Sequence, residues 1–190
     1  MGTNKTLIVA TASRSIGDFP LEGICSAGSL PLGASGGIDV DWSDVKFCTV
    51  AQMATIAAVQ LAGARAHVVQ RYALPKSEAC SYMMRMDYCK VLGIEREERF
   101  TRHSTDDRFV PLTAIPIDET SADPGGTADM LTRVVGKNAG FTESAKDTLG
   151  LSFCEVMDNI VQHSDAPAPG VAGAQWFPNL GYVETCVADC

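Results

Sequence analysis

The amino-acid sequence predicts an α/β protein, in which a βαβα module precedes two helices and a β-hairpin. Two observations carry this prediction. In the first half, short β-branched or alternating runs are followed by stretches rich in Ala and Met, an order typical of parallel strands covered by helices. In the second half, a long amphipathic stretch precedes two strand-like runs, which are separated by turn-forming residues at 178–180.

The first elements are two strands and a helix. Thr6–Thr11 is a β-branched run, 12–37 is rich in Gly, Ser and Pro and favours a loop, and Ile38–Trp42 alternates like a half-buried strand. A helix is predicted over Val50–Ala62, because Thr49 or a neighbour can cap it and its Ala, Met and Ile content suits packing on a sheet.

Glycine and proline residues set the boundaries of the remaining elements of the module. Gly63 is predicted to end the first helix, Ala66–Val69 forms the next strand, and a second helix opens at Pro75 and runs to about Tyr88. The charged run Glu95–Arg99 is interpreted as a solvated turn or helix end.

A domain boundary is predicted near residues 115–125. Phe109–Ile117 is a strand interrupted by prolines, and a Pro-Gly-Gly sequence follows it at 124–126. We therefore divide the chain into a first segment, 1–117, and a second segment, 118–190.

The second segment is predicted to contain two helices and a hairpin. A helix over Thr127–Asn138 stops at Gly140, a longer one lies within Phe141–His163, and two strands follow at Gly170–Phe177 and Gly181–Ala188. In the long helix, apolar residues recur at spacings of three and four, which predicts a stripe buried under the hairpin. These residues are Leu149, Phe153, Val156, Met157 and Ile160.

Polar residues form a second stripe on the long helix. Glu155, Asn159 and His163 are spaced at i, i+4 and i+8, which places them on one ridge. A glutamate can take a proton from water, and an asparagine carbonyl oxygen is a hard, neutral ligand of the kind that Mg²⁺ accepts. A solvated helix face explains the same pattern equally well.

Composition excludes several classes of protein. The chain has 190 residues, a net charge of −8 and no basic patch, so a nucleic-acid surface is not expected. Its apolar runs are too short to span a bilayer and no signal segment follows the N-terminus, which predicts a cytoplasmic protein without a membrane partner. The seven cysteines include no C-x-x-C pair, so neither a zinc site nor a redox pair is indicated.

A dehydrogenase is an alternative that the sequence disfavours. Thr11–Gly17 follows a strand like a dinucleotide loop, but Ala12 and Ser15 replace two of its glycines. Tyr72 and Lys76 have the spacing of the catalytic pair in short-chain dehydrogenases. A proline directly before Lys76 makes a shared helical turn unfavourable.

Residues from about 126 to 189 resemble the GHKL (Bergerat-fold) ATPases, a group that includes sensor histidine kinases, anti-sigma serine kinases, gyrase B and related chaperones. The matching motifs are the N-box, from Glu155 to Asn159 with His163 one turn on, and the Val-Ala-Asp sequence that ends at Asp189. The resemblance implies that ATP and Mg²⁺ are bound. It implies that Glu155 is the catalytic base, that Asn159 binds the metal, that Asp189 accepts a hydrogen bond from adenine, and that His163 belongs to the nucleotide site.

The chain departs from this family at its end. The family continues with Gly-x-Gly, a lid and a second glycine-rich box that hold the phosphates, whereas this sequence stops one residue after Asp189. We therefore expect a fragment that binds ATP weakly and does not turn it over, because the backbone donors for the phosphates are missing. The intact parent would hydrolyse Mg-ATP or phosphorylate a partner protein.

The first segment resembles, less closely, the STAS-like domains of bacterial partner-switching proteins. The matching stretches are Ile38–Phe47 with the following helix, His67–Val69, Tyr82–Met86 and Leu92–Ile94. The phosphoacceptor serine of such proteins is absent, and only Thr49 offers a hydroxyl nearby. The resemblance implies a protein partner, and an alternative function is a non-enzymatic regulator that docks its partner through this segment.

Overall fold

The structure, a computed structural model, describes residues 5–8, 38–102, 104–105, 107–117, 124–163 and 168–189. These residues form a mixed α/β fold with two three-stranded sheets. The first sheet is parallel, in the order β1-β2-β3, and the second is antiparallel, in the order β4-β5-β6. The strands are β1 (Lys5–Ile8), β2 (Ile38–Asp41), β3 (Gln70–Ala73), β4 (Phe109–Ile115), β5 (Gly170–Phe177) and β6 (Tyr182–Ala188). The loop predicted over 12–37 lies outside the described residues.

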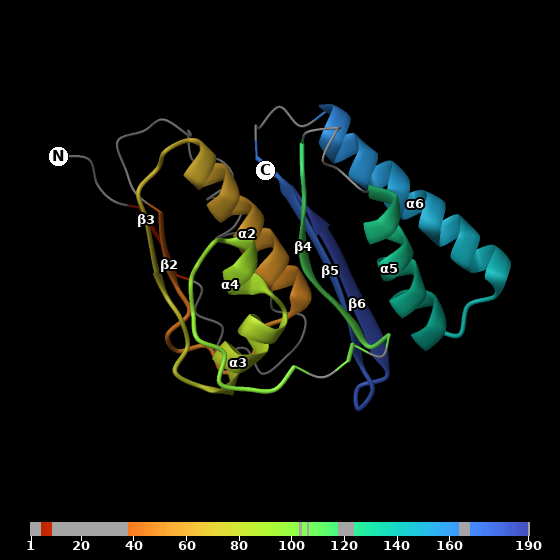
Figure 1. The fold of residues 1–190 in the computed structure, drawn as a ribbon, viewed down its shortest axis with the longest axis horizontal. Helices are drawn as coiled ribbons and strands as arrows, with labels where there is room; N and C mark the ends of the chain where they lie inside the picture. The colour runs from red at the N-terminus through yellow and green to blue at the C-terminus, as the bar shows by residue number, and fades with distance from the viewer. Residues whose placement is uncertain are drawn as a thin grey trace.

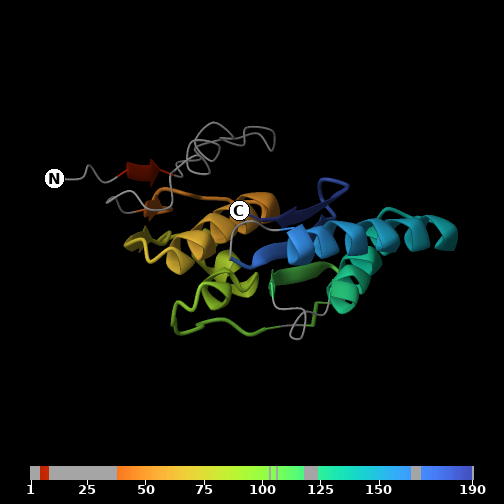
Figure 2. The same cartoon turned by 90° about the horizontal axis from the view of Figure 1, so that it is seen from above.

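The helices separate and cover the sheets. They are α2 (Val50–Arg65), α3 (Glu78–Arg85), α4 (Tyr88–Val91), α5 (Pro124–Asn138) and α6 (Glu143–His163). Figure 1 shows β2 and β3 on one side of α2, the β4-β5-β6 sheet on its other side, and α5 and α6 beyond that sheet. The view from above also places β2 and β3 at one end and α5 and α6 at the other (Figure 2).

Helix α2 packs against both sheets, and two glycines mark the contacts. A Cβ atom on Gly63 would lie 2.7 Å from Ile38 Cδ1 of β2, and one on Gly173 of β5 would lie 3.1 Å from Val50 Cγ1. A methyl group at either position would force the neighbouring side chain to shift. Most residues of α2 are buried around its whole circumference, as expected for a helix with a sheet on either side.

The start of α2 confirms the prediction and its end does not. Thr49 is the N-cap residue, and it forms a capping box with Gln52: the Gln52 amide donates to the Thr49 hydroxyl, and the Gln52 side chain accepts from the Thr49 amide. The helix continues past Gly63 to Arg65. Gly63 was predicted to end the helix, but it is a point of close approach to β2.

Two more predicted boundaries are wrong for local reasons. The strand expected over 66–69 lies instead at Gln70–Ala73, because α2 is longer and His67 then turns the chain with φ 56°. The helix expected over 75–88 begins after its N-cap, Ser77, and breaks at Asp87, whose φ is 59°. The Asp87 carboxylate is held by the Arg102 guanidinium at 2.6 Å, which secures this turn.

Strand β4 links the two segments. It falls within 1–117, yet it pairs antiparallel with β5 of the second segment. Pro111 lies where the register of this pair shifts, between Val110 and Thr113, a position at which the missing N–H of proline is tolerated. Leu112 and Val171 join the hydrophobic core around α2, so the two segments share that core.

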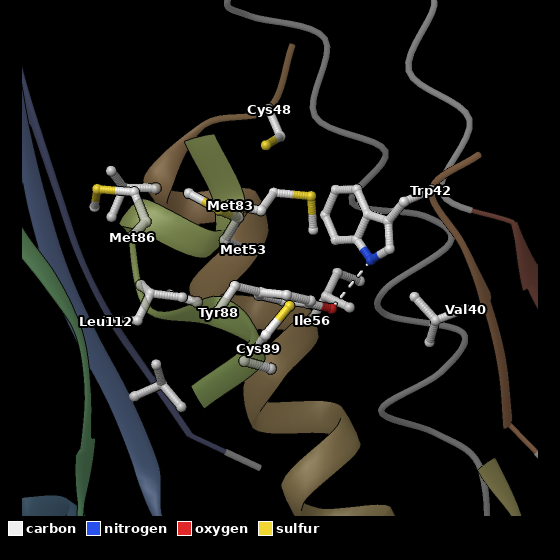
Figure 3. Close-up of a cluster of buried hydrophobic side chains, with 14 of the residues drawn as sticks. Val40, Trp42, Cys48, Met53, Ile56, Met83, Met86, Tyr88, Cys89 and Leu112 are labelled. Atoms are coloured by element: carbon white, nitrogen blue, oxygen red, sulfur yellow. Dashed lines mark hydrogen bonds between the residues drawn. The ribbon is translucent and has the colours of Figure 1, made fainter. Parts of the chain in front are cut away.

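A buried polar chain crosses this core (Figure 3). The Trp42 indole N–H donates to the Tyr88 hydroxyl at 3.0 Å, and that hydroxyl donates to Gln60 Oε1 at 2.5 Å. Methionine and cysteine side chains surround the two rings. The hydrogen bonds allow polar atoms to be buried in an otherwise apolar layer.

The hairpin prediction is confirmed, because β5 and β6 pair antiparallel from Val171–Ala188 to Phe177–Tyr182. Helices α5 and α6 cover the face of this sheet opposite to α2. None of the helices in the described residues combines the length and apolar character needed to cross a lipid bilayer.

Candidate functional site

The predicted ridge of α6 faces solvent. Phe153, Met157 and Ile160 are buried against α5 and the sheet, whereas Glu155 and Asn159 are exposed. Glu155 follows Phe153 by two residues, a rotation of roughly 200° about the helix axis. Both polar side chains therefore point away from the sheet. For His163, the structure describes the backbone as the last residue of α6.

The predicted apolar stripe needs one correction. Val156 was expected under the hairpin, but its side chain is 46% exposed. The stripe is centred on Phe153, Met157 and Ile160, and Val156 lies at its margin. This rotation of α6 is what turns Glu155 and Asn159 outward.

Asp189 lies at the end of β6, on the side of the sheet that carries α5 and α6. Val183 and Val187 pack against the core of those helices, whereas Cys186 and Ala188 pack toward α2. Because strand side chains alternate between faces, the residue after Ala188 is directed to the helical side. Asp189 itself is exposed.

A close contact brings this strand end near α6. The last hairpin pair is Val171 with Ala188, so one further step places Asp189 opposite Gly170. A Cβ atom on Gly170 would lie 2.9 Å from Ile160 Cδ1 of α6. The structure thus brings Asp189 and the C-terminal half of α6 to one end of the same side of the sheet. The resemblance implies that Glu155, Asn159 and Asp189 line one nucleotide site, but the side chains of Glu155 and Asn159 point to solvent and away from the sheet.

Electrostatics around this part of α6 are negative. Burial raises the pKa of the Cys154 thiol, and nearby Asp158, Asp129 and Glu155 raise it further. Among the residues that the structure describes, no group of three or more His, Cys, Asp or Glu side chains is placed to hold a metal ion. The acidic side chains near this part of α6 therefore repel anions.

A pocket of about 410 Å³ lies elsewhere, in the first segment. Its lining includes Met84, Cys89, Lys90 and Arg96, and none of the predicted site residues belongs to it. Basic and acidic side chains alternate along its rim, since Glu95 and Glu98 also line it. The pocket is separate from the C-terminal half of α6.

Two further candidates are placed by the structure. Tyr72 lies in β3 and Lys76 in the connection before α3, so this pair lacks the shared helical turn of the short-chain dehydrogenases, whereas Thr11–Gly17 lies outside the described residues. Thr49 is 6% exposed and its hydroxyl accepts the Gln52 amide. The Thr49 hydroxyl is therefore closed to solvent and already serves as a capping acceptor, so a phosphoacceptor role would require this turn to open.

The sequence reasoning did not single out Gly170 as a positioning residue. A signal was present, because β5 begins Gly-Val-Ala-Gly-Ala, and Gly170, Ala172 and Ala174 face the helices. Small residues on one face of a strand permit close approach of a helix. Comparison of the chain with protein-family models, with curated proteins and with solved structures gave no match.

Proposed function

We propose that α6 and the β5-β6 hairpin, with Asp189 directly after it, form the adenine end of a GHKL-type nucleotide site. In this proposal Asp189 accepts a hydrogen bond from the adenine amino group, Asn159 binds Mg²⁺ at the phosphates, and Glu155 activates the attacking group. The observation that supports it is the contact of Gly170 with Ile160. This contact sets the end of β6 beside the half of α6 that carries Asn159.

The order of elements supports the same proposal. Strand β4 is followed by α5, α6, the β5-β6 hairpin and then Asp189, and a helix, a hairpin and an aspartate is the order that the resemblance implies. Within the described residues, the side chains of Glu155 and Asn159 form no ion pair or hydrogen bond with other groups, so both are free to meet a ligand. The reaction proposed for the complete site is Mg-ATP hydrolysis or phosphotransfer to a protein.

Titration of the chain with adenosine and with Mg-ATP tests the proposal. We expect adenosine to shift the backbone amide NMR signals at the end of β6 and at the C-terminal half of α6. One charge-assisted hydrogen bond and partial burial of the ring supply a few kcal/mol, which corresponds to a dissociation constant of roughly a millimolar.

Matched variants separate the roles. Asp189→Ala is expected to abolish the adenosine shifts, and Asn159→Ala is expected to remove only the Mg²⁺-dependent part of ATP binding. Asp147→Ala is the control, because it removes an exposed carboxylate from α6 about 18 Å from Asn159 along the helix axis. Adenosine shifts that persist in Asp189→Ala would refute the assignment.

The alternative function, a non-enzymatic regulator that binds a protein partner, is supported by a different observation. Two apolar side chains at β3, Val69 and Tyr72, are exposed on the first segment. Partner binding without any adenosine response would favour this alternative.

A further inference from the structure

Strand β3 has one hydrogen-bonding edge that no described residue covers. The Ile38 amide donates to the Val69 carbonyl at 2.9 Å, and the Trp42 amide donates to the Ala73 carbonyl at 2.8 Å. Alternate residues of a parallel strand direct their backbone groups to opposite sides, so Gln70 and Tyr72 direct theirs away from β2. Within the described residues β3 pairs with β2 alone. A free edge of this kind is a template for another strand.

The side chains at this edge are suited to a partner. Val69 is 67% exposed and Tyr72 is 44% exposed. Edge strands are often protected by a proline or a bulge, but the outward-facing positions here hold Gln70 and Tyr72, and Pro75 comes only after the strand. Because Val69 and Tyr72 lie three positions apart, they face opposite sides of the sheet, and an added strand with apolar residues on one face would bury Tyr72 and favour association.

The charge at the edge selects the partner. Arg65, Arg71 and Lys76 are exposed, and none of them forms an ion pair in the described structure. Asp39 lies one strand further in, in register with Arg71. The edge is thus rich in cations on a chain whose net charge is −8, which suits an acidic partner.

A second copy of the chain is a poorer occupant. Antiparallel pairing of two β3 strands about a twofold axis would bring the same short strand, with its Arg71, against itself. Like charges across a strand pair are destabilising. The edge therefore favours a different chain that carries carboxylates.

We propose that β3 binds an extended acidic segment of a partner protein by adding it as a fourth strand to the β1-β2-β3 sheet. The backbone groups of Gln70 and Tyr72 pair with the segment, its apolar side chains lie on the face of the sheet that carries Tyr72, and its carboxylates lie on the opposite face near Arg71, with Lys76 just beyond the strand. This inference does not depend on the nucleotide proposal.

The test uses the full chain and a short capped peptide of alternating Glu and Val. A matched peptide of alternating Lys and Val is the control. We expect the Glu peptide to bind, as measured by fluorescence anisotropy, and to slow hydrogen exchange at the Gln70 and Tyr72 amides. We expect no binding of the Lys peptide, and weaker binding of the Glu peptide at high salt.

Variants of the chain test charge and backbone separately. Arg71→Glu combined with Lys76→Glu is expected to weaken Glu-peptide binding about tenfold, whereas Arg108→Glu, at an exposed site beside the other sheet, leaves it unchanged. Tyr72→Pro removes an outward N–H and is expected to prevent binding. Tyr72→Ser keeps that N–H and is expected to weaken binding only partly.

Three results would overturn the proposal. The first is equal binding of the Lys and Glu peptides. The second is slowed hydrogen exchange at other residues in place of Gln70 and Tyr72 when the Glu peptide binds. The third is a concentration-dependent dimer that protects the Gln70 and Tyr72 amides in the absence of peptide. Asp189→Ala should bind the Glu peptide normally, so failure here is distinguishable from failure of the nucleotide site.

Discussion

Removal of the Tyr88 hydroxyl, a single oxygen atom, is expected to destabilise the fold because two buried hydrogen bonds are lost with it. In Tyr88→Phe the ring keeps its edge-to-face packing on Trp42, with centroids 5.5 Å apart. The loss is confined to two hydrogen bonds, at 3.0 Å from Trp42 Nε1 and at 2.5 Å to Gln60 Oε1. Trp42, Tyr88 and Gln60 are all at most 2% exposed, so water cannot replace the missing partner.

The size of the expected loss of stability follows from the two groups left without hydrogen-bond partners, the Trp42 indole N–H and Gln60 Oε1. A buried polar group without a hydrogen bond costs about 1–3 kcal/mol, and some relaxation of Gln60 is expected. We therefore expect Tyr88→Phe to lower the free energy of unfolding by about 2–4 kcal/mol. For a domain of this size that corresponds to a fall in Tm of roughly 5–15 °C. Burial raises the pKa of the Tyr88 phenol, so the effect should not change with pH in the neutral range.

Urea denaturation followed by circular dichroism and Trp fluorescence measures this loss. Tyr82→Phe is the matched control, because the Tyr82 hydroxyl is buried without a hydrogen-bond partner in the described structure. Its removal is expected to leave stability unchanged or to raise it. A loss of stability in Tyr88→Phe no larger than that in Tyr82→Phe would refute this expectation. So would a double variant, Tyr88→Phe with Gln60→Leu, that is no more stable than Tyr88→Phe alone.

Three further outcomes are expected. Gly170→Ala should destabilise the fold by about 1–3 kcal/mol in urea denaturation, because the new methyl group would overlap Ile160; an unchanged midpoint would contradict the close contact. The hydrogen bond from Lys137 on α5 is the chief cause that lowers the pKa of the Asp107 carboxyl from 3.8. The contribution of Asp107 to the free energy of unfolding is therefore present above pH 3.8 and is lost as the pH falls through the lowered pKa. Acid titration of Asp107→Asn should therefore show a shallower loss of stability below pH 3.8. Glu184→Ala removes the carboxylate that accepts the Val50 amide at 3.0 Å, and it should cost about 1–2 kcal/mol in thermal denaturation, whereas Glu184→Gln should cost less.

Much of the secondary structure was predictable because its causes are local. Thr49 caps α2 through a hydroxyl that needs only the amide three residues on. The hairpin follows from alternating strands around a short turn, and β5 and β6 pair as expected. Local signals were wrong at Gly63, where a nearby strand rather than a helix end explains the small residue. They were wrong again at Asp87, where a distant arginine, Arg102, stabilises the break.

The candidate site was predictable only as a set of residues. The spacing of Glu155 and Asn159 placed them on one ridge, and the structure keeps them there. The direction of that ridge depends on which apolar side chains of α6 meet α5 and the sheet. Val156 and Met157 are both apolar, yet Val156 is 46% exposed and Met157 is 0% exposed. Hydrophobicity alone could therefore not predict the rotation of α6 about its axis.

The sequence by itself determined the α/β class, the order of the elements and the identity of the polar residues on α6, because side-chain period, caps and turns act over a few positions. Tertiary structure alone decided that α2 lies between two sheets, that β4 joins the second sheet, and that β3 pairs on one edge only among the described residues. Each of these depends on which distant surfaces bury one another. The sequence of α2 is apolar on every side, which requires burial but leaves its partners undetermined.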